Sequence, residues 1–175
     1  MSECSPARSG SPEVAQTRPA SPRALVLGFG NVLLCDDGAG VRLVEQLRSE
    51  PGPIADFVDG GTLSFSLLPY VEATDSLLVI DAADFDSAPG TVRLLEGGAM
   101  DAFLTGGRRR SVHEVGLIDL LDMARLQDCF PSRRALLCIQ PLRIDWCEGL
   151  STPVAEAMPE AARQARATLH RWQRA

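Results

Sequence analysis

The sequence predicts an α/β fold: one domain with a twisted, mainly parallel sheet of about five strands and helices on both faces. Short apolar segments alternate with amphipathic segments along the chain, which is typical of strands joined by helical crossovers. The segment 77–80 is apolar throughout, as central parallel strands tend to be. The 175 residues suffice for one domain with a sizeable core.

Each element is predicted from its local pattern. The expected strands are 24–27, 53–62, 77–80, 90–98 and 134–142, with the fourth near an edge. The expected helices are 38–50, 63–71, 113–127 and 152–173, and 97–111 reads as a loop. Two helices have a clear apolar face: Val41, Val44 and Leu47 in the first, and Val115, Ile118 and Leu121 in the third. Pro159 predicts a kink or break in the last helix.

Composition narrows the class of protein. The net charge is −6, which argues against nucleic acid or an anionic membrane as the main partner, and no apolar run approaches a membrane span. Residues 1–23 are rich in Ser, Pro and Ala; we expect a dispensable disordered tail before an α/β domain of residues 24–175. The five cysteines include no Cys-x-x-Cys pair, so a disulfide framework is poorly supported and a cytoplasmic location is expected.

The loop after the first strand, "LGFGNVLLCDDGAGVR", invites a nucleotide-binding interpretation. Gly28 and Gly30 match the start of a dinucleotide fingerprint, but Leu33 stands where the third glycine belongs. Asp36 and Asp37 would also repel phosphate. A nucleotide-binding α/β protein is therefore the least favoured alternative.

Three residues are the candidate site: Asp37, Asp81 and His113. In parallel sheets the ligand lies beyond the carboxyl ends of the strands, where Asp37 and Asp81 are expected. Each has a structural alternative, because Asp37 or Asp36 can cap the first helix, Asp81 can cap a loop and His113 can pack at a helix start. Together, two carboxylates and an imidazole can hold a borderline divalent cation with open positions.

Four motifs, in order, give the chain a family resemblance. "LVLGFGNVLLCDDGAGVR", "DGGT", "LLVIDAAD" with "APGT" after it, and "SVHEVGL" resemble the maturation endopeptidases of nickel–iron hydrogenases, from Ala24 to the final helix. The resemblance implies a single α/β domain that cuts a C-terminal extension from the hydrogenase large-subunit precursor once nickel is inserted. It also implies that Asp37, Asp81 and His113 contact the metal. Many members have Glu in place of Asp37, and Cys35 departs from the expected pattern without an evident role.

The resemblance further implies a cytoplasmic protein, monomeric when free, with nickel supplied by the precursor and no organic cofactor. The metal could polarise the scissile carbonyl or activate water. Alternatively it could only dock the precursor, with Asp37 or Asp81 as general base. Three ligands without a thiolate predict weak metal binding by the free protein. A non-cleaving assembly factor is the alternative function, and Arg108–Arg110 could receive the precursor's tail or simply form a solvated loop.

Overall fold

The computed structural model describes residues 24–52, 55–62, 65–106, 111 and 113–174. The predicted tail, 1–23, and the arginine run, 108–110, lie outside these described residues.

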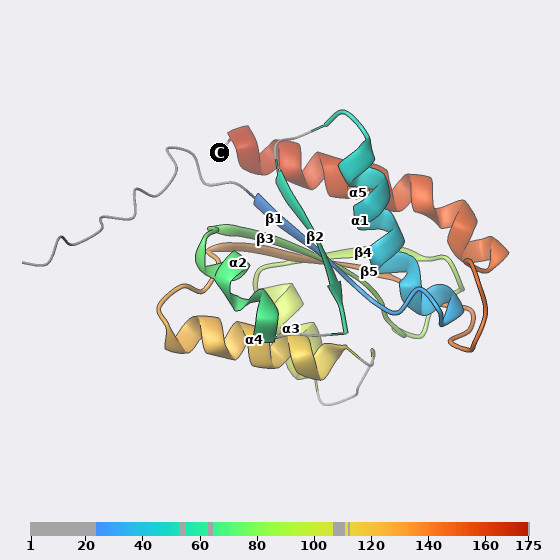
Figure 1. Cartoon of the computed structure of the whole chain (residues 1–175), viewed down its shortest axis with the longest axis horizontal. Coiled ribbons are helices and arrows are strands. Elements are labelled where there is room, and N and C mark those ends of the chain that lie inside the picture. The colour runs from blue at the N-terminus through green and yellow to red at the C-terminus, as the bar shows by residue number, and fades with distance from the viewer. Residues whose placement is uncertain (1–23, 53–54, 63–64, 107–110, 112, 175) are drawn as a thin grey trace, which may run out of the picture.

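The domain is built around one five-stranded sheet with the strand order β2-β1-β3-β5-β4 (Figure 1). The strands are β1 (Ala24–Phe29), β2 (Ala55–Gly61), β3 (Ser76–Ala82), β4 (Val92–Glu96) and β5 (Arg133–Ile139). Four strands are parallel, and β4 pairs antiparallel with β5 at one edge. The predicted sheet is confirmed, including the edge position of its fourth strand.

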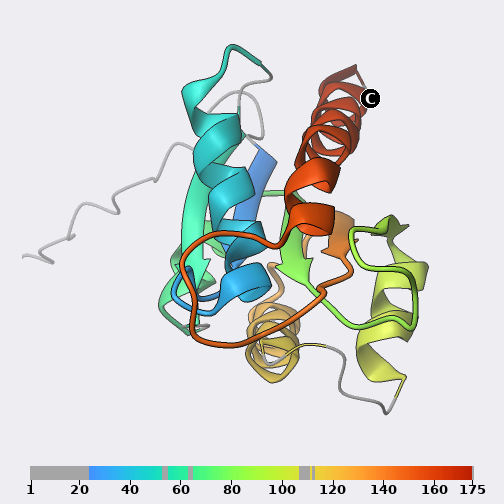
Figure 2. The same cartoon turned by 90° about the vertical axis from the view of Figure 1, so that its right-hand side faces the viewer.

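Helices cover both faces of the sheet (Figures 1 and 2). One face carries α1 (Ala39–Ser49) and α5 (Thr152–Arg174), and the other carries α2 (Leu68–Glu72), α3 (Gly98–Thr105) and α4 (Glu114–Leu126). Leu77 and Leu78 show why two cores form, because successive strand residues point to opposite faces and these two belong to different clusters. Each face is therefore closed by its own apolar layer.

Three local predictions are wrong. The segment 97–111 is not all loop, because α3 occupies Gly98–Thr105 between the glycines at its two ends. Val115 is 43% exposed, whereas Leu121 is buried and Ile118 packs against the core as predicted; Leu117 and Leu120 complete the buried face of α4. Of the kink or break predicted at Pro159, the break is wrong, because α5 continues through this residue, and the kink stays a prediction.

The continuity of α5 has a simple explanation. Proline removes the hydrogen bond to the carbonyl four residues earlier, which belongs to Ala155. Both Pro159 and Ala155 are exposed, so water can reach that carbonyl. The opposite side of α5 is held by buried residues such as Met158, Ala162 and Ala165.

The predicted helix 63–71 is only partly helical. A 3-10 turn, Phe65–Leu67, leads into the short helix α2, and residues 63–64 lie outside the described part of the chain.

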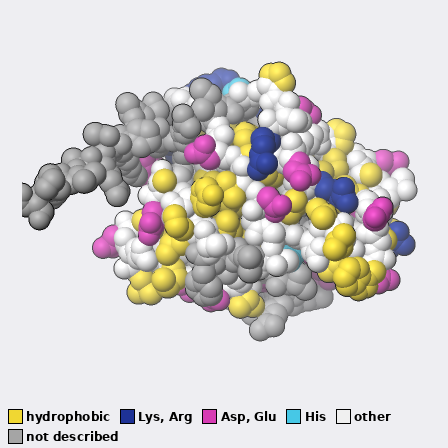
Figure 3. Space-filling view, in the orientation of Figure 1, with side chains coloured by type: hydrophobic (Ala, Val, Ile, Leu, Met, Phe, Trp, Pro, Cys, Tyr) yellow, Lys and Arg dark blue, Asp and Glu magenta, His cyan; other side chains and the backbone are white. Residues whose placement is uncertain are grey.

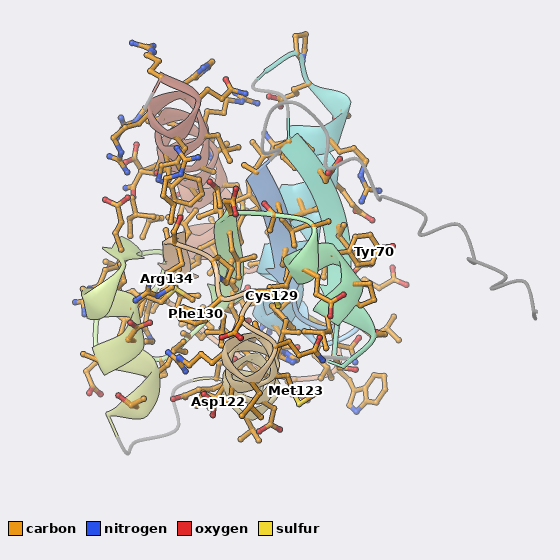
Figure 4. All side chains as sticks on the ribbon, turned by 90° about the vertical axis from the view of Figure 1, so that its left-hand side faces the viewer. Tyr70, Asp122, Met123, Cys129, Phe130 and Arg134 are labelled. Carbon is orange, nitrogen blue, oxygen red and sulfur yellow. A yellow bond between two sulfur atoms is a disulfide. The ribbon has the colours of Figure 1, made fainter. Side chains whose placement is uncertain are left out.

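Two arginines pack on one aromatic ring, Phe130, close to the end of α4 that Figure 4 shows. The guanidinium groups of Arg125 and Arg134 lie 4.2 and 4.6 Å from the centre of the Phe130 ring. Arg134 also forms an ion pair with Asp101 of α3. These contacts join α3, α4 and β5 on this side.

The surface gives no sign of a membrane span. No helix among the described residues is both long and apolar enough to cross a membrane. On the face seen in Figure 3, acidic and basic side chains are interspersed with apolar ones.

The strand order sets where a ligand can bind. The chain passes from β1 to β2 on one side and then crosses to β3 on the other side of β1. In open parallel sheets, such a reversal leaves a crevice at the carboxyl ends of the two strands. Asp81 near the end of β3 and the loop after β1 flank this crevice.

Candidate active site

The loop after β1 folds back tightly on itself. Gly30 has a φ of +138°, and a Cβ there would lie 2.0 Å from the backbone oxygen of Asp37, so only glycine fits. The backbone N–H of Asn31 donates to Oδ2 of Asp37 at 2.8 Å. The side chain of Asn31 in turn accepts from the N–H of Leu33 at 3.0 Å. The glycine and Asn31 therefore fix the position of the Asp37 carboxylate.

Asp37 is paired with His113 across the crevice. Nε2 of His113 lies 3.1 and 3.2 Å from the two carboxylate oxygens of Asp37, and both residues are buried. The His113 ring lies over Phe29, with the ring centres 6.4 Å apart. Asp37 sits in a 3-10 turn, Cys35–Gly38, and Gly38 is the N-cap of α1 without a side-chain cap bond. The capping alternative for Asp36 and Asp37 is therefore wrong.

Asp81, near the end of β3, is joined to the same group through Ser111. The hydroxyl of Ser111 donates to Oδ2 of Asp81 at 2.5 Å and accepts from the backbone N–H of His113 at 3.1 Å. The other oxygen, Oδ1 of Asp81, is buried and has no hydrogen-bond partner among the described residues. A buried carboxylate oxygen without a donor is costly, so this oxygen stands ready for a proton or a cation.

The surroundings raise the pKa of both Asp81 and His113. Burial raises the pKa of Asp81 to about 7, with a further rise from the charge of Asp37, against the lowering effects of His113 and Ser111. Burial alone would lower the pKa of His113, but the hydrogen bond that its ring donates to Asp37 and the charges of Asp81 and Asp37 raise the pKa above its usual value. Asp81 and His113 therefore keep their protons to a higher pH than the isolated side chains would.

The three predicted site residues thus lie in one group: Asp37 bonds His113 directly, and Ser111 connects His113 with Asp81. Among the side chains that the structure describes, no three His, Cys, Asp or Glu residues are placed to hold a metal ion together. What the group can do as it stands is bind and transfer protons, and offer carboxylate and imidazole ligands to a cation that brings its own further ligands.

Two spaces border this group. A cavity of about 10 Å³, with room for roughly one water, lies between Asp81, Ser111 and residues of α3. The sequence had not predicted this helix. An open hollow of about 280 Å³ lies beside the loop after β1 and is lined by Asn31, Asp59 and Thr62 among others. The hollow adjoins the group through Asn31, whose backbone N–H bonds Asp37.

Asp36 has a different role from that of its neighbour. Its carboxylate accepts hydrogen bonds from the backbone N–H groups of Leu142, Arg143 and Ser151 and from the Ser151 hydroxyl, at 2.7–3.1 Å. Burial works to raise the pKa of Asp36, but these bonds outweigh it and hold the pKa below its usual value. We call this arrangement the Asp36 clamp; it ties the segment before α5 to the loop of the site.

A disulfide adds a second link at the same place. Cys35 and Cys147 are joined, with Cα atoms 5.0 Å apart and a sequence separation of 112. The expectation from the cysteine count is therefore wrong for this pair. Spacing along the chain could not reveal it, because the fold alone brings the loop after β1 against the segment before α5.

Other residues of the site were also missed by sequence reasoning. Ser111 had a usable signal, since a Ser two residues before a helix-start His can accept its N–H in a local turn. Asp36 had none, because its partners lie more than 100 residues away.

A buried Asp–His pair with a second carboxylate at the carboxyl edge of a parallel sheet defines a class of protein: an α/β enzyme equipped for acid–base chemistry or cation binding, as hydrolases are. The family follows from comparison, since residues 41–168 match hydrogenase maturation protease, HycI. The chain belongs to this family and is a peptidase.

Individual relatives agree with this assignment. The chain is 37% identical to the hydrogenase expression/formation protein HupD of Rhizobium leguminosarum bv. viciae, over 88% of this chain and 77% of HupD. It is 38% identical to the hydrogenase 2 maturation protease of Escherichia coli K12, over 80% of this chain and 85% of that protein.

Solved structures give the same fold. The Escherichia coli hydrogenase maturating endopeptidase HybD superposes with a TM-score of 0.78 at 34% identity, covering 85% of this chain and 93% of HybD. HybD of Thermococcus kodakarensis superposes with a TM-score of 0.74 at 27% identity, covering 83% of this chain and 97% of that one.

Proposed function

We propose that the chain removes the C-terminal extension of a nickel–iron hydrogenase large-subunit precursor after nickel insertion, and that Asp37, Asp81 and His113 contact the nickel. The observation that carries this proposal is the buried Oδ1 of Asp81, which has no described partner and lies in the same hydrogen-bonded group as the Asp37–His113 pair. Family membership supports the peptidase activity, and the donor chemistry supports the metal contact.

The spacing of Asp37 and His113 suits a shared cation. Two ligands that each lie about 2.0–2.2 Å from one divalent ion are roughly 3 Å apart. Nε2 of His113 is 3.1 Å from Oδ2 of Asp37, so a proton now stands near the position that such an ion would take. Binding nickel would displace that proton, and the precursor's own thiolates would supply the remaining ligands.

The position of Asp81 is compatible with two roles. It can give its free oxygen to the nickel, or it can take a proton from the water that attacks the scissile carbonyl. A pKa of about 7 is well matched to the second role at neutral pH. In both cases Ser111 orients the carboxylate, and burial in the crevice strengthens its interaction with any positive charge.

The direct test compares nickel-loaded and metal-free precursor at equal enzyme concentration, with intact mass as the readout. Cleavage of the loaded precursor alone is the expected result. Equal rates for both forms would refute nickel sensing by Asp37, Asp81 and His113. Binding of the loaded precursor without any loss of mass would instead favour the assembly-factor alternative.

We also propose that the free chain is a monomer in the cytoplasm, where it meets its precursor. The absence of a membrane-spanning helix among the described residues is compatible with that placement. Fractionation of cells, together with the elution volume of the purified protein, tests both statements.

A further inference from the structure

Exposed apolar side chains are concentrated beside the candidate site. Seven large apolar residues are exposed in the described part of the chain, and four of them lie on the two segments that the Asp36 clamp joins. These four, which we call the docking surface, are Leu33, Leu142, Ile144 and Trp146, with exposures of 52%, 54%, 45% and 76%. A single exposed apolar residue needs no explanation, but four of seven at one place do.

The two segments are fixed to each other. The N–H of Cys147 donates to the carbonyl of Leu33 at 3.2 Å, and the N–H of Cys35 donates to the carbonyl of Cys147 at 3.3 Å. The Cys35–Cys147 disulfide and the Asp36 clamp reinforce this pairing. A loop anchored so heavily presents its side chains at little entropic cost on binding.

The docking surface adjoins the site through the chain itself. Leu33 lies between Asn31 and Asp37, whose hydrogen bond closes the loop of the site. Figures 1 and 2 show the loop after β1 and the segment before α5 side by side at one end of the molecule. Apolar side chains gather at the lower right of Figure 3, over that same end. The docking surface and Asp37 therefore share the loop after β1.

We propose that the docking surface binds an apolar area on the folded hydrogenase precursor next to its cleavage site; this inference rests on the proposed function. Obligate homodimer interfaces are large and mostly apolar, whereas this surface has only four exposed large apolar side chains on two short segments. They suit a transient complex, in which a few apolar anchors supply most of the binding energy. The anchors' segment carries two acidic residues, Asp145 and Glu148, against one basic residue, Arg143, and the net charge of the chain is −6, so an anionic membrane is a poor partner.

The test uses the full chain and purified nickel-loaded precursor. The variants are Trp146→Ala and the double variant Ile144→Ser with Trp146→Ser; Leu126→Ser is the matched control, because Leu126 is 81% exposed at the other end of α4. We expect the Kd for the precursor and the KM to rise at least about tenfold in the double variant, with less in Trp146→Ala, while kcat falls less than threefold. The control should bind and cleave like wild type, and all melting temperatures should agree.

The outcomes separate this inference from the proposed function. Unchanged Kd and KM in both variants would overturn the docking surface, and so would a wild-type protein that does not bind the precursor at all. A wild type that binds without cleaving would refute the proposed function alone, and the Kd values would still decide the docking surface. A wild type that elutes as a dimer, with the variants as monomers, would show that a second copy covers the surface and would overturn the inference.

Discussion

The Asp36 clamp and the Asp81 end of the site each bury a carboxylate at the same edge of the sheet. Asp36 accepts four hydrogen bonds, and its pKa is lowered. Asp81 accepts one from Ser111, leaves Oδ1 without a described partner, and has its pKa raised to about 7. Neither side chain is exposed to solvent, but Asp81 lies deeper in the protein than Asp36. Stronger desolvation and fewer donors together raise the pKa of Asp81, whereas four donors outweigh the weaker desolvation of Asp36.

The difference teaches how to separate a structural carboxylate from a functional one. A fully satisfied buried carboxylate stabilises the fold and is chemically quiet. A buried carboxylate with an orphaned oxygen costs stability, and such a cost is typically found where function requires it. Substitutions at Asp81 should therefore lower activity and spare stability. Substitutions at Asp36 should lower stability and spare activity for as long as the protein stays folded.

The largest expected effect is that of Asp81→Asn on processing. The amide keeps the shape of the side chain but can neither ionise for a metal nor take a proton from water, so cleavage should fall at least about 100-fold. The melting temperature should stay the same or rise, because no carboxyl remains to be desolvated. Precursor mass and thermal unfolding measure the two effects. Processing within a few-fold of the wild-type rate would remove Asp81 from the site.

The second effect is that of Asp36→Ala on stability. Loss of the carboxylate leaves the Ser151 N–H and hydroxyl without their acceptor and frees the segment before α5, at a cost on the order of 3 kcal/mol. Urea unfolding measures it. Ser151→Ala is the matched control, because it removes only one of the four hydrogen bonds and should cost about 1 kcal/mol. An unchanged urea midpoint for Asp36→Ala would show that the clamp is not structural.

The sequence predicted the parts of this comparison that depend on local pattern. The apolar run in β3 located Asp81 near the end of a buried strand, and the glycine-bounded loop placed Asp37 beside it. These inferences succeed because side-chain periodicity and the geometry of parallel sheets determine which strand ends meet.

The parts that failed depend on contacts distant in sequence or on weak local signals. Asp36 and Cys147 find their partners only when the fold closes. The helix α3 was missed because glycines at both ends and only eight residues give little periodicity. Leu117, not Val115, faces the core, where it lines the small cavity together with residues of α3 and β5. The sequence of α4 alone does not reveal these neighbours.

A third effect concerns the disulfide that lies beside the Asp36 clamp. Cys147→Ser removes the Cys35–Cys147 disulfide, which should cost about 2–4 kcal/mol in oxidising buffer, by the usual effect of a cross-link that closes a long loop. In excess dithiothreitol the variant and wild type should unfold alike, and that condition is the control. A difference that persists in dithiothreitol would mean that Cys147 stabilises the fold by packing. Without the disulfide, the Asp36 clamp and the backbone hydrogen bonds of Cys147 would still hold the segment.

The last expected effect is the pH dependence of stability in the metal-free protein, and it separates the two carboxylates by sign. Asp81 has a folded-state pKa of about 7 against a model value of 3.8, so the folded protein binds more protons than the unfolded chain between about pH 4 and 7.

The stability contributed by Asp81 must therefore fall as the pH rises through this window, and the raised pKa of His113 acts in the same direction. Asp36 has the opposite sign: its lowered pKa gives stability above its unfolded value, which is lost as the pH falls through the folded one. Because Asp36 is present in both proteins, it cancels when Asp81→Asn is compared with wild type. The melting temperature of Asp81→Asn minus that of wild type should then increase from pH 4 to pH 7, by an amount on the order of ten degrees. A difference that stays constant over this range would mean that Asp81 is ionised in the folded protein, and the contrast with Asp36 would then lie in geometry alone.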